Sequence, residues 1–179
     1  MIFIPIIFCK ALLYFISLNF TFSSKLKNGT GKVKEYNIIN DKLIFEGEYL
    51  NGKRNGKGKE YDYGELRFEG EYLNGDRNGK GKEYYDDKLK FEGEYLNGER
   101  NGKGKEYLFG ELIYEGEYLN GKRKGEGKEY DDNGRLIYEG EFLNDLRHGK
   151  GKEYFDDGRL KYEGEFTNGK YANNRNFSV

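Results

Sequence analysis

Hydrophobic and charged positions alternate along much of this chain, and residues 43–50 show the pattern most clearly. Aromatic residues and a glycine occupy one parity of that stretch, and glutamates occupy the other. A period of two sustained over such a stretch predicts a β-strand with one buried face. The pair Asn51-Gly52 comes next, and it is typical of a hairpin turn because both residues tolerate positive φ. A second alternating run over residues 56–61 completes a predicted β-hairpin.

The hairpin pattern returns until the chain ends. Its starting residues are spaced by 23 residues three times and then by 24 residues twice, which indicates an array of one supersecondary unit. Helix is disfavoured because every complete unit holds several glycines, each of which costs a helix about 1 kcal/mol. We therefore predict an all-β fold, an elongated single antiparallel meander of repeated β-hairpins. The units begin at Leu43, Leu66, Leu89, Leu112, Leu136 and Leu160.

The chain divides into four segments. Residues 1–22 are almost continuously apolar, and residues 172–179 form a short tail. Residues 43–171 hold six units, the last of them incomplete. Residues 23–42 contain a degenerate leading half-unit, which resembles the second strand of a unit with Val33 in place of a glycine. Repeat arrays commonly have such atypical ends, because a terminal unit has only one neighbour.

Three interpretations of residues 1–22 stay open. A retained hydrophobic helix would anchor the chain in a membrane, since about 20 residues span the hydrocarbon core. Lys10 costs such an anchor roughly 2.5–3.5 kcal/mol on insertion scales, which the surrounding apolar residues offset. The segment is alternatively a cleaved signal peptide, which predicts secretion, or a stretch without a role. Retention predicts repeats on the cytoplasmic side, because lysines follow the segment and nothing basic precedes it.

Composition limits the classes of partner. The chain has 31 Lys plus Arg and 32 Asp plus Glu, which leaves a net charge of −1. A nucleic-acid binder usually carries a basic excess or a face of one sign, so we expect no nucleic-acid partner. The 17 Tyr and 13 Phe argue for a folded chain, since disordered chains are poor in aromatic residues. The expected core is thin and built from aromatic rings.

The sequence provides little for catalysis. Residues 25–177 contain neither serine nor cysteine, and His148 is the only histidine, so no nucleophile–base pair can be assembled. Paired carboxylates such as Glu46 and Glu48 recur in every unit, whereas an active site occurs once. We therefore predict that the chain is not an enzyme and that it uses no cofactor and no metal.

Each repeated residue type has a structural role in the predicted hairpin. Aromatic residues form rows across the sheet, and a glycine such as Gly47 lets a neighbouring ring lie flat on the backbone. Glutamates of the first strand and lysines of the second, such as Glu46 and Lys59, face each other if the register places them opposite. Each such pair contributes about 0.2–1 kcal/mol and helps to fix the register.

A ring-lined face or a sheet edge is the expected binding surface. Binding of acidic headgroups through cations such as Lys53, Arg54, Lys57 and Lys59 is an alternative, and the near-zero net charge counts against it. The candidate residues for the ring-lined face are two aromatic positions from each of five units: Tyr49, Tyr72, Tyr95, Tyr118 and Phe142, and Tyr61, Tyr84, Tyr107, Tyr130 and Tyr154.

The repeat also resembles a known family. Residues 114–127 read Tyr-Glu-Gly-Glu-Tyr-Leu-Asn-Gly-Lys-Arg-Lys-Gly-Glu-Gly, which is similar to a MORN repeat. The resemblance implies an elongated, twisted antiparallel sheet of hairpins, in proteins that act as membrane-proximal scaffolds, bind phospholipids or self-associate. This chain departs from the family pattern by having Tyr or Phe in place of the usual Trp. Its charged turns between units are similar to those of a bacterial, antitoxin-type variant of the repeat.

These observations together predict a non-catalytic scaffold that mediates protein–protein interaction or self-association near a membrane. Association with that membrane would come from residues 1–22. Phospholipid headgroup binding and an antitoxin- or immunity-type role are the alternatives.

Overall fold

The computed structural model describes residues 20–22 and 29–172. A hydrophobic helix was expected for residues 1–22, and residues 1–19 of that segment lie outside the described residues. Its last three residues, Phe20–Phe22, form a short β-strand, which corrects the expected end of the helix. Among the described residues, none belongs to a helix with the length and apolar character needed to span a membrane.

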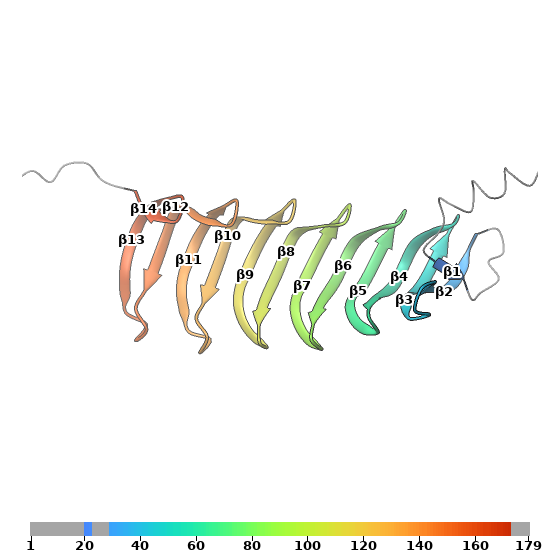
Figure 1. Ribbon diagram of the computed structural model, residues 1–179. Coiled ribbons are helices and arrows are strands. Elements are labelled where there is room, and N and C mark those ends of the chain that lie inside the picture. Colours follow the sequence, from blue (N-terminus) through green and yellow to red (C-terminus); the bar gives the residue numbers. More distant parts are fainter. Residues whose placement is uncertain (1–19, 23–28, 173–179) are drawn as a thin grey trace, which may run out of the picture.

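The described residues form one open antiparallel sheet of 14 strands that follow one another in chain order (Figure 1). This arrangement confirms the predicted meander of hairpins. The strands are β1 (Phe20–Phe22), β2 (Gly31–Asn37), β3 (Leu43–Leu50), β4 (Lys53–Asp62), β5 (Glu65–Leu73), β6 (Asp76–Tyr85), β7 (Lys88–Leu96), β8 (Glu99–Leu108), β9 (Glu111–Leu119), β10 (Lys122–Tyr130), β11 (Leu136–Leu143), β12 (Leu146–Tyr154), β13 (Leu160–Thr167) and β14 (Lys170–Tyr171).

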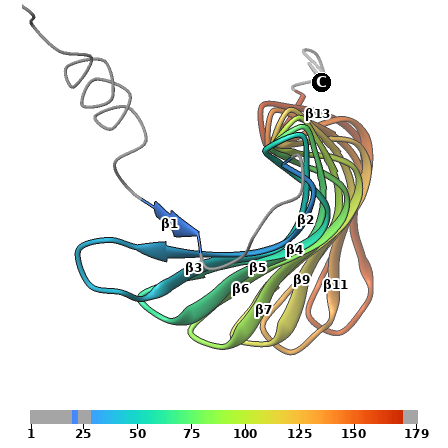
Figure 2. The same cartoon turned by 90° about the vertical axis from the view of Figure 1, so that its right-hand side faces the viewer.

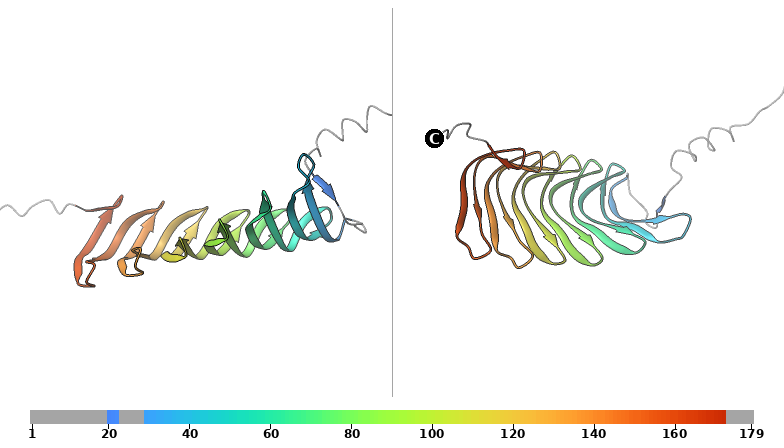
Figure 3. Two further views of the ribbon diagram at one scale, coloured as in Figure 1. Left: turned by 60° about the horizontal axis from the view of Figure 1, so that its bottom comes forward. Right: turned by 60° about the vertical axis from the view of Figure 1, so that its left-hand side comes forward.

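The sheet is long, curved and twisted. Hairpins stand side by side along one axis, so that each touches only its neighbours (Figure 1). Seen along that axis, every hairpin is bent, and the sheet forms a trough (Figure 2). The strand direction turns progressively from one end to the other (Figure 3). This twist is expected of an open sheet, because each strand has a right-handed twist of its own.

The turns within hairpins use the predicted chemistry. Asn51 and Gly52 join β3 to β4 with φ values of 51° and 77°. Asparagine and glycine tolerate this left-handed conformation better than other residues. The additional residue in the two longest periods lies in the turns between units, as between β10 and β11, where Asp131 N donates to Arg135 O at 3.0 Å. The register beyond that turn is unchanged, since Gly127 still lies opposite Gly140.

The core is a single row of aromatic rings on one face of the sheet. Phe68 contacts Tyr72 of its own strand and Tyr95 of the next hairpin, with ring centroids 5.7 and 5.2 Å apart. Both contacts are edge-to-face, and the same pattern runs from Phe45 to Phe166. Such pairs contribute about 0.5–1.5 kcal/mol each beyond the area they bury. A thin sheet therefore obtains a continuous core without a second layer.

Glycines lie under these rings in one column that crosses the sheet. Gly58 of β4, for example, lies opposite both Gly47 and Gly70. A Cβ atom at Gly47 would lie 2.6 Å from Cζ of Phe45 and 2.7 Å from the carbonyl oxygen of Lys57. These distances are too short for any side chain, because a ring occupies the space over the glycine.

A chain of arginines and glutamates covers the rings from outside. Arg100 pairs with Glu83 and with Glu106, each at 2.6 Å, and its guanidinium carbon lies 4.0 Å from the centroid of Phe91. Burial alone would raise the pKa of the Glu83 carboxyl. Hydrogen bonds from Arg100 and Tyr95 and the charge of Arg100 outweigh burial, so the pKa lies below its ordinary value. The full arginine–glutamate chain is Glu35, Arg54, Glu60, Arg77, Glu83, Arg100, Glu106, Arg123, Glu129, Arg147 and Glu153.

The two ends of the array replace the repeated contacts with different ones. Val33 of β2 takes a glycine position at the first end and is 2% exposed against the core. At the other end Tyr171 stands opposite Phe166, which is the register position that an arginine holds in the complete hairpins. Its ring stacks on Tyr162 at 4.1 Å, and its hydroxyl donates to Glu153. Tyr171 thereby ends both the row of rings and the arginine–glutamate chain.

Candidate binding groove

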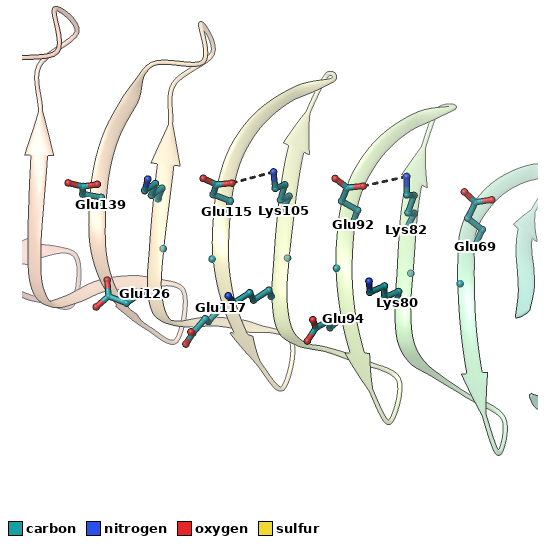
Figure 4. Close-up of a pocket in the computed structure, with 18 of the residues that line it drawn as sticks. Glu69, Lys80, Lys82, Glu92, Glu94, Lys105, Glu115, Glu117, Glu126 and Glu139 are labelled. Carbon is teal, nitrogen blue, oxygen red and sulfur yellow. Dashed lines mark ion pairs between the residues drawn. The ribbon is translucent and has the colours of Figure 1, made fainter. Parts of the chain in front are cut away.

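The face of the sheet opposite the rings carries a continuous groove. It has a volume of about 1770 Å³ and is lined by residues from Lys32 of β2 to Glu165 of β13. Glycines such as Gly93 and Gly104 form its floor, and charged side chains rise on both sides of that floor (Figure 4). We call this feature the charged groove. A Cβ at these glycines would point away from the groove, toward the rings on the other face, and backbone is exposed along the floor.

Two rows of charges line the charged groove, named here by their position in Figure 4. The upper row includes Lys82, Glu92 and Lys105, and the lower row includes Lys80 and Glu94. Each row alternates in sign, because first strands supply glutamate and second strands supply lysine. Neighbouring strands lie about 4.8 Å apart, so charges of one sign recur about every 10 Å along the groove.

Ion pairs in the upper row join neighbouring units. The register, which the sequence left open, places Glu46 opposite Lys59 within a hairpin, and it also places Lys59 opposite Glu69 of the next hairpin. The pairs closest in distance are those between units, and their side chains are partly exposed, so each contributes at most about 1 kcal/mol. They are Lys34–Glu46 at 3.3 Å, Lys59–Glu69 at 3.6 Å, Lys82–Glu92 at 3.4 Å, Lys105–Glu115 at 3.4 Å and Lys152–Glu163 at 3.7 Å.

Tyrosines fix the glutamates of the upper row. Tyr61, near the end of β4, donates from its hydroxyl to Oε1 of Glu46 at 2.7 Å. This hydrogen bond is the main cause that lowers the pKa of Glu46 below its ordinary value. Burial and the same hydrogen bond raise the pKa of Tyr61 to about 12. The equivalent pairs are Tyr84–Glu69, Tyr107–Glu92, Tyr130–Glu115 and Tyr154–Glu139, at 2.6, 2.8, 2.8 and 2.7 Å.

The lower row has one break in its alternation. Glu126 stands where other second strands have a lysine, and the register places it opposite Glu141. The matching pair one unit earlier is Lys103 with Glu117. The charged groove is therefore more acidic around β10 and β11 than elsewhere. Like-charged residues opposite each other disfavour strand pairing, so this substitution has no structural benefit in the sheet.

The structure divides the ten candidate aromatic residues into two groups. The five at the end of the first strands are 3–8% exposed, lie in the core and do not line the charged groove. Their burial leaves them no area for a partner: Tyr49, Tyr72, Tyr95, Tyr118 and Phe142. The five in the second strands are half-buried and flank the upper row through their glutamate contacts: Tyr61, Tyr84, Tyr107, Tyr130 and Tyr154.

The cations considered for lipid headgroups do not all lie on one face of the sheet. Lys57 and Lys59 line the charged groove. Arg54 lies on the opposite face, where it pairs with Glu35 and Glu60 and covers the ring of Phe45. Sequence reasoning missed this role, although the recurrence of arginine at one position in five hairpins was a usable signal.

Residues 20–22 and 29–172 hold no group of three or more His, Cys, Asp or Glu side chains that could bind a metal ion. His148 lies in β12, within the repeated framework of the sheet. The charged groove combines ordered charges with an open floor.

Two of the solved structures that match this chain resemble it only weakly. One is a crystal structure of TarM, with 13% identity and a TM-score of 0.29, which covers 76% of this chain. Another is a point mutant of S. aureus TarM in complex with Fondaparinux, alpha-GlcNAc-glycerol and UDP, with 10% identity and a TM-score of 0.21, which covers 87% of this chain. This chain spans 24% of the length of either one. No curated protein matches its sequence.

The family comparison agrees with the hairpin architecture. A model of the MORN repeat matches residues 45–63, 68–90, 91–108, 114–135, 138–158 and 162–172. The six matches fall on the six hairpins from β3–β4 to β13–β14. Because they cover more than half of the sequence, this chain belongs to the MORN-repeat family.

Proposed function

We propose that this protein is a non-catalytic scaffold that binds a protein partner along the charged groove. The observation that carries the proposal is the continuity of the groove across every hairpin, with an open glycine floor between two rows of fixed charges. A partner segment lying along the groove would meet the same set of groups in each unit. Contact repeated over many units is how solenoid arrays form extended binding surfaces.

The charges of the groove favour a polypeptide over a polyanion or an acidic membrane. Lysines and glutamates alternate and pair with each other at 3.3–3.7 Å, so the groove has no excess of one sign over most of its length. Attraction to acidic lipid needs a local basic excess. A polypeptide carries both signs and can match alternating charges, and its backbone can approach the sheet closely over glycine.

Membrane association is a separate part of the proposal and depends on residues 1–22. We infer that this apolar segment holds the repeats at the cytoplasmic face of a membrane, since lysines follow it. Localisation of the full chain beside a chain that starts at Ser24 tests this part. Loss of membrane association in the shorter chain supports it, and secretion of the full chain contradicts it.

The groove itself is tested by site-specific photo-crosslinking in the native cell. A photoreactive residue replaces Lys103 or Glu94, which line the groove, and replaces Glu99 as a control, which is exposed but does not line it. We expect the two groove positions to give the same protein adduct and the control position to give none. Equal adducts at all three positions would contradict the proposal. So would salt-sensitive sedimentation of the protein with anionic vesicles in the absence of any adduct.

A further inference from the structure

A second surface lies at the turns between hairpins, away from the charged groove. We propose that three consecutive turns, residues 62–65, 85–88 and 108–111, form a docking strip for a segment of another protein that carries lysine or arginine at about every third position. We call these turns the aromatic rim. The proposal goes beyond the binding of a partner in the groove. It concerns the row of turns at one end of the strands, and a partner of different chemistry.

The aromatic rim presents one large exposed ring in each turn. Tyr63, Tyr85 and Phe109 are 73%, 67% and 81% exposed. The five rings at the ends of the first strands are buried in the core, tyrosines such as Tyr61 are held by a glutamate, and Phe155, in the last turn between hairpins, is less exposed at 45%. Adjacent hairpins are two strands apart, so the three turns succeed one another at about 10 Å. Exposed aromatic residues in such a row are characteristic of interaction surfaces.

Turn geometry does not explain these rings. Tyr63 and Phe109 have φ values of 51° and 54°, in the left-handed region. The turns within hairpins lie at the other end of the strands and place asparagine in that conformation. Asn51 and Asn97, for example, have φ values of 51° and 50°. A bulky residue there costs roughly 1–2 kcal/mol, and asparagine lowers that cost. A sequence selected for folding alone would place asparagine at both edges.

The rings already contact cations from their own chain. In each of three hairpins, a lysine or arginine near the start of the first strand lies beside the exposed ring that ends or follows the second strand. The distance is typical of a cation–π contact. The large exposed fraction of the rings leaves further ring surface open to a second cation. The contacts are Lys42 with Tyr63 at 5.6 Å, Arg67 with Tyr85 at 5.3 Å and Lys88 with Phe109 at 5.8 Å, measured to the ring centroid.

The charge of the aromatic rim matches a basic segment. Its three turns hold five carboxylates and one lysine, and Arg67 nearby pairs with two of the five. This acidic excess repels an anionic membrane surface, and it repels the same rim of a second copy. Aromatic faces with carboxylates beside them attract lysine and arginine in two ways, through cation–π contacts with the rings and through charge-assisted hydrogen bonds to the carboxylates. The carboxylates are Asp62, Glu65, Asp86, Asp87 and Glu111, and all are exposed.

The spacing of the turns sets the pattern of the partner. An extended polypeptide advances about 3.3 Å per residue, so every third residue moves along by about 10 Å. That step equals the distance between successive turns of the rim. A basic residue at every third position would therefore place one cation on each of the three rings.

The test is the affinity of the full chain for two synthetic peptides, measured by fluorescence anisotropy. One has lysine at every third position, and the other has the same composition with its lysines consecutive. We expect the spaced peptide to bind at least tenfold more tightly. A double variant, Tyr63→Asn with Phe109→Asn, should lose at least tenfold in affinity, and its fold should be retained because asparagine suits both turns.

A matched control is Leu96→Asn, at an exposed leucine that ends the first strand of a hairpin at the opposite edge. Its affinity for the spaced peptide should equal that of the parent chain. Equal affinity of the double variant and the parent would overturn the proposal, as would equal affinity for the two peptides. Binding to anionic vesicles or self-association that depends on Tyr63 and Phe109 would assign the rim to another occupant. None of these variants alters the groove, so crosslinking there tests the proposed function separately.

Discussion

At the scale of single residues, the covering ring determines where glycine is required. Gly93 has an ordinary backbone conformation, yet a Cβ there would lie 2.6 Å from Cζ of Phe91 and 2.7 Å from the carbonyl oxygen of Lys103. Gly98, in the hairpin turn, shows the other reason for glycine. Its φ is +88°, and a Cβ there would meet nothing within 4 Å. One glycine is needed for space and the other for conformation.

This difference predicts opposite outcomes for two substitutions. Gly93→Val should lower the free energy of unfolding by about 1–3 kcal/mol, because the side chain must displace a buried ring and neighbouring backbone. Gly98→Asn should change it little, because asparagine adopts positive φ and the site is open. Urea unfolding followed by circular dichroism measures both. Equal stability of Gly93→Val and the parent chain would contradict the packing of rings on glycine.

At the scale of the hairpin, each of the first five units is closed by a tyrosine–glutamate hydrogen bond between its two strands. Tyr107 of β8 donates to Glu92 of β7 at 2.8 Å. Burial and this bond raise the pKa of Tyr107 to about 12, and the same holds for Tyr61, Tyr84 and Tyr130. The protonated tyrosine is thus the form that the folded hairpin holds.

The raised pKa values predict a loss of stability in alkali. Unfolded tyrosine ionises near pH 10, whereas these four ionise near 12 in the folded chain. Their stabilisation is complete below pH 10 and is lost as the pH rises from 10 to 12. Urea unfolding on both sides of pH 10 should show this fall. A variant with phenylalanine at all four positions should show a smaller fall, and an unchanged fall would contradict the assignment.

The hairpin is also the level at which the sequence was most informative. Alternation, Asn-Gly turns and the period predicted the strands and the meander, which the structure confirms, whereas the register of Glu46 with Lys59 was left open and comes from the structure. Parity places Tyr49 and Arg54 on a face, but it does not show what covers that face. Burial of the ring depends on Arg54 crossing Phe45 to reach Glu35 in a neighbouring unit. The first-strand rings of the expected binding face therefore lie beneath the arginine–glutamate chain.

At the scale of the whole molecule, strands pair with their neighbours in chain order, and side-chain contacts such as Phe68–Tyr95 and Arg54–Glu35 reach the next strand but one. Stability is then a sum over units and the interfaces between them, as in other linear arrays. The aromatic row, the glycine column and the arginine–glutamate chain all repeat with the unit. Removing one complete unit should therefore let the two cut ends meet with the same contacts.

Deletion of residues 89–111 tests this directly, because it removes one unit of 23 residues and joins Lys88 to Leu112. We expect a folded sheet whose longest dimension in small-angle scattering is shorter by about 10 Å, the width of two strands. Deletion of residues 88–98 is the control, since it removes β7 alone and makes β8 follow β6, which places lysines opposite lysines and leaves no ring over the glycines. The control should be far less stable. Equal loss of structure in both would show that the units are not interchangeable.

Because the two ends of the array differ from its repeated middle, units can be added to the middle without changing the ends. Val33 and Tyr171 differ from the residues at the same positions in the complete hairpins, and they terminate the ring row from either side. In-frame duplication of a central unit would leave both terminators in place and lengthen the groove between them. The length of the partner that this protein can hold is therefore open to change by gene rearrangement, without any new side-chain contact having to evolve.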